Sequence, residues 1–423
     1  MKCARGVLPH DCPTLRRVLR QRRWTPLPVP FFTQSATFSR LWPVTRHHVE
    51  DVVENGKYSH GRKVVELERA LAEYTGARHV IGVNSGTDAL VLLLRACGLG
   101  AGDEVVVPAF SFAATATSVV LAGGTPVFAD VEPDGYGISP ASVAAVATPR
   151  TRFVMPTHLF HHTADLTGVR EVADRLGLAV VEDSAEAIGM RYGGRHAGLH
   201  GFGGVLSFFP TKTLGALGDA GAVITDDPRV AEVVSALRHH GRPGPTADNF
   251  PAINTATALP GVNSKMDDVQ AAVLLAKLGR LEQDIRRRAE LAARYTARLT
   301  GVPGVRKLPE VLPRAEAVRG VAYVYVAEFA RRDELAEHLA ARGVGTETYY
   351  PLPLHLQPCF AHLGHAPGDF PNAEAACAHA LALPLYPDLA EEQVDRVCAE
   401  IRDFYAASDL HLSAPAANRG SRR

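Results

Sequence analysis

The sequence predicts an α/β protein built on a mostly parallel β-sheet with helices on both of its faces. Two observations carry this prediction. Apolar runs of about four to six residues alternate with segments of helical period from about residue 80 to residue 230. The runs are apolar throughout, as expected of strands buried on both faces of a sheet. With 423 residues, the chain is long enough for two or three domains and a large core.

The elements follow one another along the chain in a regular order. Strands are expected at residues 80–83, 104–107, 126–130, 153–157, 178–181 and 222–225, and helices at residues 64–74, 113–122, 140–147, 166–176 and 267–299. Residues 322–327 then alternate as a strand does, and residues 332–342 have helical period. We therefore predict a large domain at residues 44–300 and a smaller C-terminal α+β domain at residues 301–407.

Both ends of the chain differ in composition from the rest. Residues 1–43 are rich in arginine and proline and poor in acidic residues, and residues 408–423 form a polar tail. We expect both segments to be disordered. For the N-terminal segment, an organelle presequence and a start codon assigned too far upstream are the alternatives.

The charge balance and the cysteines narrow the class of protein. The chain has 45 basic and 45 acidic side chains, so nothing indicates binding to nucleic acid or to an anionic membrane. No apolar run has the length of about 18 residues or more that a membrane span needs. The six cysteines have no paired spacing, which is typical of free thiols in a reducing compartment, and we expect a cytoplasmic protein.

One lysine stands between two predicted strands, in residues 207–221. An apolar run ends at Lys212, and a glycine-rich turn and a second apolar run follow. Burial among apolar neighbours lowers the pKa of a lysine and frees the amine as a nucleophile toward a carbonyl carbon. The alternative is a surface lysine at the tip of a hairpin, because lysines are mostly exposed.

A helix N-terminus provides a candidate phosphate site. The strand at 80–83 is followed by small residues and then by a strongly apolar helix, so the amides near Ser85, Gly86 and Thr87 have no helical acceptors. Unpaired amides at a helix N-terminus suit a phosphate. Alternatively, Ser85 or Thr87 caps the helix without any ligand.

Two further strand ends carry candidate ligand contacts. Asp183 follows a buried strand, at the sheet edge where open α/β sheets bind ligands, and a carboxylate there can pair with a protonated ring nitrogen. Its alternative role is to cap the next helix. Phe110 and Phe112 follow the strand at 104–107, and one of the two is expected to lie on a cofactor ring while the other belongs to the core.

In this order along the chain, these segments describe a pyridoxal phosphate site, and the chain resembles the DegT/DnrJ/EryC1/StrS family of sugar aminotransferases. The resemblance covers roughly residues 44–405. It implies the aspartate aminotransferase-like fold (fold type I), with a large, mostly parallel sheet of seven-stranded type. The matching segments are 84–90, 182–183, 208–212, 218–222, 261–267 and 350–357.

The resemblance assigns a role to each matching residue. Lys212 would hold pyridoxal 5'-phosphate through a Schiff base, Asp183 would bind the pyridinium nitrogen, and Phe112 would stack on the ring. The phosphate would be held by Ser85, Gly86, Thr87 and Ser207, and by Asn263 of a neighbouring subunit. A shared phosphate site implies a homodimer with shared active sites.

The sequence departs from the family pattern at three places. By the resemblance, Glu186 would stand beside the cofactor's ring hydroxyl, where many relatives have glutamine or histidine, and two negative groups there repel unless one holds a proton. Lys265 replaces the usual arginine, so a point charge is kept and bidentate recognition is lost. In a substrate-facing loop, the family usually has a histidine followed by an apolar residue, an aromatic residue and a glycine, and the adjacent His161 and His162 depart from this pattern. The residues that the resemblance places near the substrate are Tyr58, His161, Lys265, Tyr349 and His355.

Residues 158–165 contain three histidines and one aspartate. Imidazole and carboxylate groups are zinc ligands, so a metal site is one interpretation. The segment follows a predicted strand, however, and the family has a similar loop at this place. We therefore expect no metal.

The resemblance implies an aminotransferase that moves an amino group from glutamate to a keto group of a nucleotide-activated deoxysugar. The first alternative is an aminocyclitol aminotransferase that acts on a keto-inositol, with glutamine as the donor. The second alternative is a regulatory homologue without catalysis. Lys212 argues against the regulatory alternative, and the segments around Lys212 and His355 favour a nucleotide sugar.

Overall fold

The computed structural model describes residues 28–243 and 256–412, and its large sheet confirms the predicted fold class. A parallel four-stranded sheet and a three-stranded sheet meet at a parallel bridge between Glu182 and Gly204. β9 is antiparallel to both of its neighbours. Across the joined sheet the order is β3 (Thr125–Ala129), β2 (Glu104–Pro108), β4 (Thr151–Val154), β5 (Ala179–Val180), β8 (Gly204–Ser207), β9 (Gly221–Thr225) and β1 (His79–Val83).

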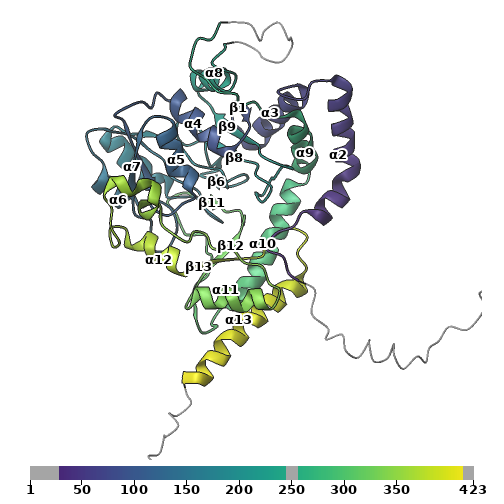
Figure 1. Cartoon of the computed structure of the whole chain (residues 1–423), viewed down its shortest axis with the longest axis vertical. Helices are drawn as coiled ribbons and strands as arrows, with labels where there is room; N and C mark the ends of the chain where they lie inside the picture. Colours follow the sequence, from purple (N-terminus) through teal and green to yellow (C-terminus); the bar gives the residue numbers. More distant parts are fainter. Residues whose placement is uncertain (1–27, 244–255, 413–423) are drawn as a thin grey trace, which may run out of the picture.

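Helices connect and cover these strands (Figure 1). They are α3 (Arg62–Thr75), α4 (Gly86–Ala96), α5 (Ala113–Leu121), α6 (Pro140–Val146), α7 (Leu166–Leu176), α8 (Pro228–Leu237) and α9 (Asp268–Leu278). α4 is central, and its Leu90, Leu92 and Leu93 are no more than 1% exposed. Burial of each such side chain contributes about 1.5–3 kcal/mol. Side chains of Ser85 and Asp227 accept hydrogen bonds from the first amides of α4 and α8, so local capping agrees with the packing.

A second unit follows in the chain and lies in the lower part of Figure 1. Its antiparallel sheet has the order β10 (Val305–Lys307), β12 (Tyr325–Phe329) and β13 (Ala380–Leu383). Its helices are α11 (Arg332–Ala341), α12 (Pro371–His379) and α13 (Glu391–Leu412), with 3-10 turns at Leu354–Leu356 and Pro358–Leu363. A small sheet of β11 (Val318–Arg319), β6 (Arg191–Tyr192) and β7 (Arg195–His196) joins this unit to the large one.

The long helix expected at residues 267–299 is two helices, α9 and α10 (Leu281–Leu299), so that prediction is wrong in its detail. The break falls at Gly279, and glycine costs about 1 kcal/mol relative to alanine inside a helix. Ile285 of α10 packs in a core of the large unit, whereas Tyr295 and Leu299 pack in the core of the second unit. α10 therefore belongs to both cores, and the domain boundary at residue 300 stays a prediction.

Residues 28–43 are ordered, so the expected disorder is wrong for this part of the N-terminal segment. Val29 is fully buried, its amide donates to the carbonyl of Gly343, and its carbonyl accepts from the amide of Gly345, both at 2.8 Å. Helix α2 (Ser35–Asn55) then runs along α9. At the other end, α13 continues through residue 412, so the expected disorder is also wrong for residues 408–412. Residues 1–27 and 413–423 lie outside the described residues.

No helix in the described ranges is long and apolar enough to cross a membrane. The four cysteines of these ranges, Cys97, Cys359, Cys377 and Cys398, are free thiols. Cys3 and Cys12, which are also expected to be free thiols, lie outside the described residues.

Candidate active site

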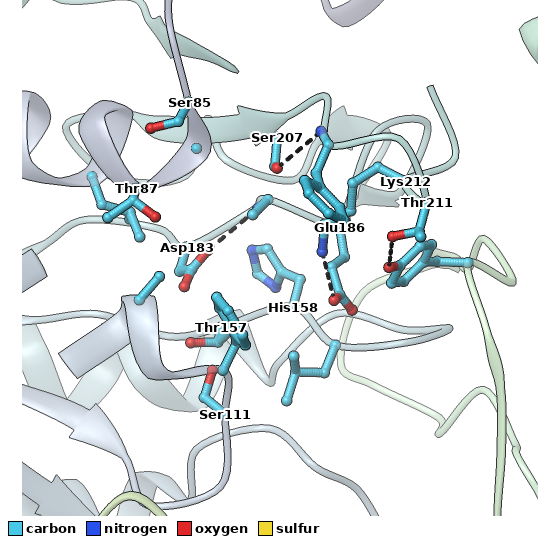
Figure 2. Close-up of a pocket in the computed structure, with 18 of the residues that line it drawn as sticks. Ser85, Thr87, Ser111, Thr157, His158, Asp183, Glu186, Ser207, Thr211 and Lys212 are labelled. Carbon is cyan, nitrogen blue, oxygen red and sulfur yellow. Dashed lines mark hydrogen bonds and ion pairs between the residues drawn. The ribbon is translucent and has the colours of Figure 1, made fainter. Parts of the chain in front are cut away.

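A cavity of about 410 Å³ opens at the carboxyl ends of the parallel strands. This is the edge at which open α/β sheets bind ligands. Figure 2 shows side chains from the segment after β5, from β8, from the start of α4 and from the Lys212 turn converging on it. Nine of the residues predicted from the sequence line it, namely Ser85, Gly86, Thr87, Phe112, Asp183, Glu186, Ser207, Lys212 and Tyr349.

Lys212 lies in this cavity and is paired with Glu186 (Figure 2). The Lys212 Nζ is 2.8 Å from Glu186 Oε1 and 4.6 Å from the centre of the Tyr323 ring. Burial lowers the pKa of Lys212, but the charge of Glu186 and the hydrogen bond to it outweigh burial and raise this pKa above its ordinary value. The prediction of a lowered pKa is therefore wrong, because it considered only the apolar neighbours.

Asp183 presents a buried carboxylate to the cavity. Its Oδ2 accepts a hydrogen bond of 2.7 Å from the Thr115 hydroxyl, and its Oδ1 accepts one of 3.3 Å from the Ala185 amide. Burial raises the pKa of Asp183, and these uncharged donors offset only part of that effect. A cation held against this carboxylate would lower its pKa, so the site suits a protonated ring nitrogen.

The neighbouring acid, Glu182, has a structural role. It is fully buried, and its carboxylate accepts hydrogen bonds from His158 Nε2 at 3.0 Å and from the Gly198 amide at 2.8 Å. The Nδ1 of His158 accepts from the amide of Ala164, which places the imidazole proton on Nε2. This arrangement fixes the end of β5, from which Asp183 projects.

The N-terminus of α4 forms the opposite end of the cavity from Lys212 in Figure 2. Ser85 Oγ accepts from the Asp88 amide at 3.1 Å, so the capping role expected as an alternative is present. A Cβ on Gly86 would lie 2.8 Å from the Cβ of Ser207, and a Cβ on Gly221 would lie 2.4 Å from the carbonyl carbon of Ser85. The two glycines therefore let β8 and β9 approach the helix amides closely, which brings Ser207 to the anion-binding end.

Several lining residues were not predicted from the sequence. In the sequence, His158 was noted only as part of the histidine segment, and Tyr323 only as part of a predicted strand. Other lining residues that were not predicted are Ser111, Thr157, Thr211 and Tyr350. Tyr323 OH and Thr211 Oγ1 are 3.1 Å apart, so Tyr323 connects the second unit to the Lys212 turn. A strand period shows which face a residue occupies but does not show that this strand reaches the cavity.

Five predicted residues do not line this cavity: Tyr58, His161, Asn263, Lys265 and His355. His161 is buried, with its Nε2 2.8 Å from the carbonyl oxygen of Glu310, and His355 Nε2 is 3.2 Å from Glu374 Oε1. Lys265 donates a hydrogen bond to Asn263, which is exposed, as Tyr58 is.

The histidine segment does not gather ligands for a metal. Among the residues that the structure describes, no group of three or more His, Cys, Asp or Glu side chains is arranged to hold one. His162 Nδ1 hydrogen-bonds the carbonyl oxygen of Thr163 at 2.8 Å. Burial lowers the pKa of His162 to about 4, which keeps its imidazole neutral at pH 7.

Pyridoxal phosphate fits these residues. Asp183 would supply the anionic partner for the ring nitrogen, Lys212 would supply the amine for the aldehyde carbon, and the α4 amides would suit the phosphate. Phe112, at the start of α5, lines the cavity and is 59% exposed, so its ring surface is available to an aromatic ligand. The close approach at Gly86 and Gly221 places Ser207 and the Ser85 backbone at the same end of the cavity, where the phosphate would bind.

Comparisons with known proteins agree with this chemistry. The model of the DegT/DnrJ/EryC1/StrS aminotransferase family matches residues 44–402. A dTDP-3-amino-3,4,6-trideoxy-alpha-D-glucose transaminase from Streptomyces venezuelae is 40% identical over 378 residues, covering 89% of this chain and 96% of that protein. A protein named "Pleiotropic regulatory protein" from Geobacillus stearothermophilus is 39% identical over 380 residues, covering 89% and 98%.

Solved structures are similar as well. The crystal structure of S. venezuelae DesV in complex with a ketimine intermediate has a TM-score of 0.83 and 39% identity, covering 89% of this chain and 98% of that chain. Bacillus subtilis ntda with bound cofactor PMP has a TM-score of 0.78 and 30% identity, covering 92% and 87%. The protein is a pyridoxal phosphate-dependent transaminase, and its chain belongs to the DegT/DnrJ/EryC1/StrS aminotransferase family.

Proposed function

We propose that this transaminase moves an amino group from glutamate to a keto group of a nucleotide-activated deoxysugar. The observation that carries the proposal is a lysine amine in a cavity of about 410 Å³, in a chain 40% identical to a protein named as a transaminase of a dTDP-linked sugar. The cavity also has Tyr349 and Tyr350 in its wall, and tyrosines provide both ring surface and hydroxyl groups for a sugar.

The residues have separate tasks in such a reaction. Pyridoxal phosphate, when bound, supplies an electron sink that makes the α-proton of the donor acidic. The Lys212 amine would take that proton from the α-carbon, and Glu186, whose Oε1 is 2.8 Å from the Lys212 Nζ, would stabilise the protonated amine. Asp183 would keep positive charge at the ring nitrogen, and Tyr323, 3% exposed, would limit access of water to the amine.

We also propose that two copies of the chain share their active sites. Asn263, which the resemblance assigns to a neighbouring subunit's phosphate, is exposed and does not line the cavity of its own chain. Exposed apolar side chains also favour a covered surface. Those that are at least half exposed include Trp42, Val44 and Val53 of α2, together with Tyr58, Phe209 and Leu217.

The donor and the acceptor are tested with the purified full-length protein loaded with pyridoxal phosphate. Visible absorbance is followed as glutamate and glutamine are added to separate samples. Bleaching by glutamate, followed by amination of a dTDP-linked keto-sugar detected by mass spectrometry, is the expected result. Bleaching by glutamine and amination of a keto-inositol would instead identify an aminocyclitol enzyme.

The shared site has a test of its own. Lys212→Ala and Asn263→Ala variants, each inactive alone, are mixed under conditions that allow subunits to exchange. One active site per mixed dimer then combines an intact lysine with an intact asparagine, so activity returns. A mixture that stays inactive although mixed dimers are shown by mass spectrometry contradicts the shared site.

A further inference from the structure

The turn that carries Lys212 folds back on itself. A Cβ on Gly215 would lie 2.3 Å from the carbonyl oxygen of Pro210, so the two ends of the turn are in contact and only glycine fits. Within the turn, the Lys212 amide donates to Phe209 O at 2.8 Å, and the Ala216 amide donates to Phe208 O at 2.8 Å. These bonds connect the turn to β8 but leave the carbonyls of Pro210 and Gly215 to find donors elsewhere.

Two side chains from distant parts of the chain supply those donors. Gln34, just before α2, donates from its Nε2 to the Pro210 carbonyl. Lys277, near the end of α9, donates from its Nζ to the Gly215 carbonyl and, at 2.7 Å, to Gln34 Oε1. The three bonds form one continuous network across both ends of the turn. We call Gln34 and Lys277 the clasp.

The clasp lies behind Lys212, away from the main cavity. A second, much smaller cavity of about 20 Å³ lies there, and its lining includes Gln34, Lys212, Thr213, Lys277, Asp284 and Arg288. Lys212 lines both cavities, so the clasp contacts the turn on one side while the main cavity lies on the other. Lys277 itself is 5% exposed.

A buried lysine is a costly way to fill this space. Removing an ammonium group from water is unfavourable, and both acceptors of Lys277 are neutral oxygens. An apolar side chain would fill the volume at lower cost. What only a long donor supplies here is a hydrogen bond to a carbonyl three residues from the reacting lysine.

We propose that Gln34 and Lys277 are positioning residues that hold the backbone of the Lys212 turn, so that the Lys212 amine keeps a fixed place in the cavity. Neither side chain lines the main cavity, and both act through the carbonyls of Pro210 and Gly215. The proposal rests on the proposed function only in taking Lys212 as the reacting amine. It makes the N-terminal strap, residues 28–37, part of the active-site scaffold.

Hydrogen exchange of single amides tests the clasp in the full chain without cofactor. In Lys277→Met, the peptide unit between Gly215 and Ala216 loses its carbonyl partner, so we expect the Ala216 amide to exchange at least about tenfold faster. In Gln34→Glu, the side chain still accepts from Lys277 but no longer donates to Pro210, so the Lys212 amide exchanges faster and the Ala216 amide changes less.

Arg40→Ala is the matched control. Arg40 lies on α2 and pairs with Asp388 at 2.7 Å, so its loss loosens the same helix without touching the turn. Unchanged exchange at Lys212 and Ala216 in both clasp variants overturns the proposal, and so does equal acceleration in Arg40→Ala. Acceleration over the whole chain shows general destabilisation and also counts against a specific clasp.

A second measurement separates positioning from support of the fold. The pH at which the visible absorbance of the pyridoxal phosphate-loaded protein changes reports the surroundings of the Lys212 nitrogen. We expect this pH to shift in Lys277→Met and to stay constant in Arg40→Ala. The exchange experiment needs neither donor nor sugar, so a failure of the proposed substrates leaves the clasp test intact.

Discussion

Lys212 is partly buried in the turn between β8 and β9, and Lys277 is buried against the same turn, but the hydrogen-bond partners of the two lysines differ in charge. Lys212 faces a carboxylate, Glu186, at 2.8 Å, and its pKa is raised. Lys277 contacts the neutral oxygens of Gln34 and Gly215. Burial, helped by the nearby charge of Arg288, lowers the pKa of Lys277 to about 8.

The comparison shows that burial alone does not set the state of a lysine. Burial lowers the pKa at both sites, and the charge of the partner decides the outcome. At Lys212, the anion stabilises the ammonium form, which suits a group that must receive a proton during turnover. At Lys277, hydrogen-bond direction matters more than charge, which suits a group that holds a backbone.

The largest expected effect separates the two lysines by function. We expect Lys212→Met to lower turnover by about 10⁴-fold or more, because the nucleophile and proton carrier is lost. Lys277→Met should lower kcat by about 10–100-fold with the KM for the donor little changed, because a misplaced group costs rate without removing the chemistry. Steady-state kinetics on both variants, with thermal unfolding to show that each is folded, measures this. Transamination retained by Lys212→Met contradicts its assigned role.

Removal of residues 1–43 tests how much the strap and the first part of α2 contribute to the stability of the fold. The family match begins at residue 44, yet Val29 is fully buried and Leu41 is 7% exposed, and burial of each contributes about 1.5–3 kcal/mol. We expect the shortened chain to lose about 3–6 kcal/mol of unfolding free energy in urea. A chain without residues 2–27, which keeps all of these contacts, is the control. Equal stability of the two shortened chains contradicts the structural role of the strap.

The contrast between the main cavity and the clasp side of the Lys212 turn also shows what the sequence could predict. The buried strands and helices were predictable because their apolar runs are continuous, and helix α7 was predicted at its observed bounds, residues 166–176. Lys212, Asp183 and Ser85 were predictable because each follows a strand at the binding edge of the sheet. The strap was not, because its proline and polar residues show no period; only its tertiary contacts order it.

Long-range pairing explains most of the remaining errors. Nothing near Lys212 in the sequence indicates that Glu186, 26 positions earlier, would raise its pKa. Similarly, Gln34 and Lys277 are 243 positions apart, and neither belongs to a motif. His161 was predicted to lie near the substrate because its loop matches one in the family. Its imidazole instead hydrogen-bonds the carbonyl oxygen of Glu310 and does not reach the cavity.

The pH dependence of stability sharpens the comparison further. The folded pKa of Lys277 is about 8, below its ordinary value of 10.5, so between these pH values the unfolded chain binds more protons than the folded one. Stability therefore rises with pH through this window, by about 3 kcal/mol in total at this site. Lys277→Met lacks the effect, so the difference between wild type and variant isolates it from other groups. A difference that stays constant from pH 7.5 to about 10.5 in urea denaturation would mean that the pKa of Lys277 is not lowered.

The smallest expected effect concerns the partner of Lys212. Glu186→Gln keeps the shape of the side chain and removes its charge, so burial acts on Lys212 with less opposition and the pKa of Lys212 falls. Each unit of decrease raises the neutral amine fraction about tenfold near pH 8, which is about 1.4 kcal/mol. Because only the neutral amine attacks the aldehyde, the initial rate of pyridoxal phosphate incorporation should rise and should level off at a lower pH than in wild type.

Glu374→Gln is the matched control for this measurement, since Glu374 also pairs with a nitrogen base, His355, at 3.2 Å but does not line the cavity. Its rate profile against pH should coincide with that of wild type. A Glu186→Gln profile that levels off at the wild-type pH would mean that another group sets the proton affinity of Lys212. Asp183 would then be the group to test next, because its charge also raises the pKa of Lys212.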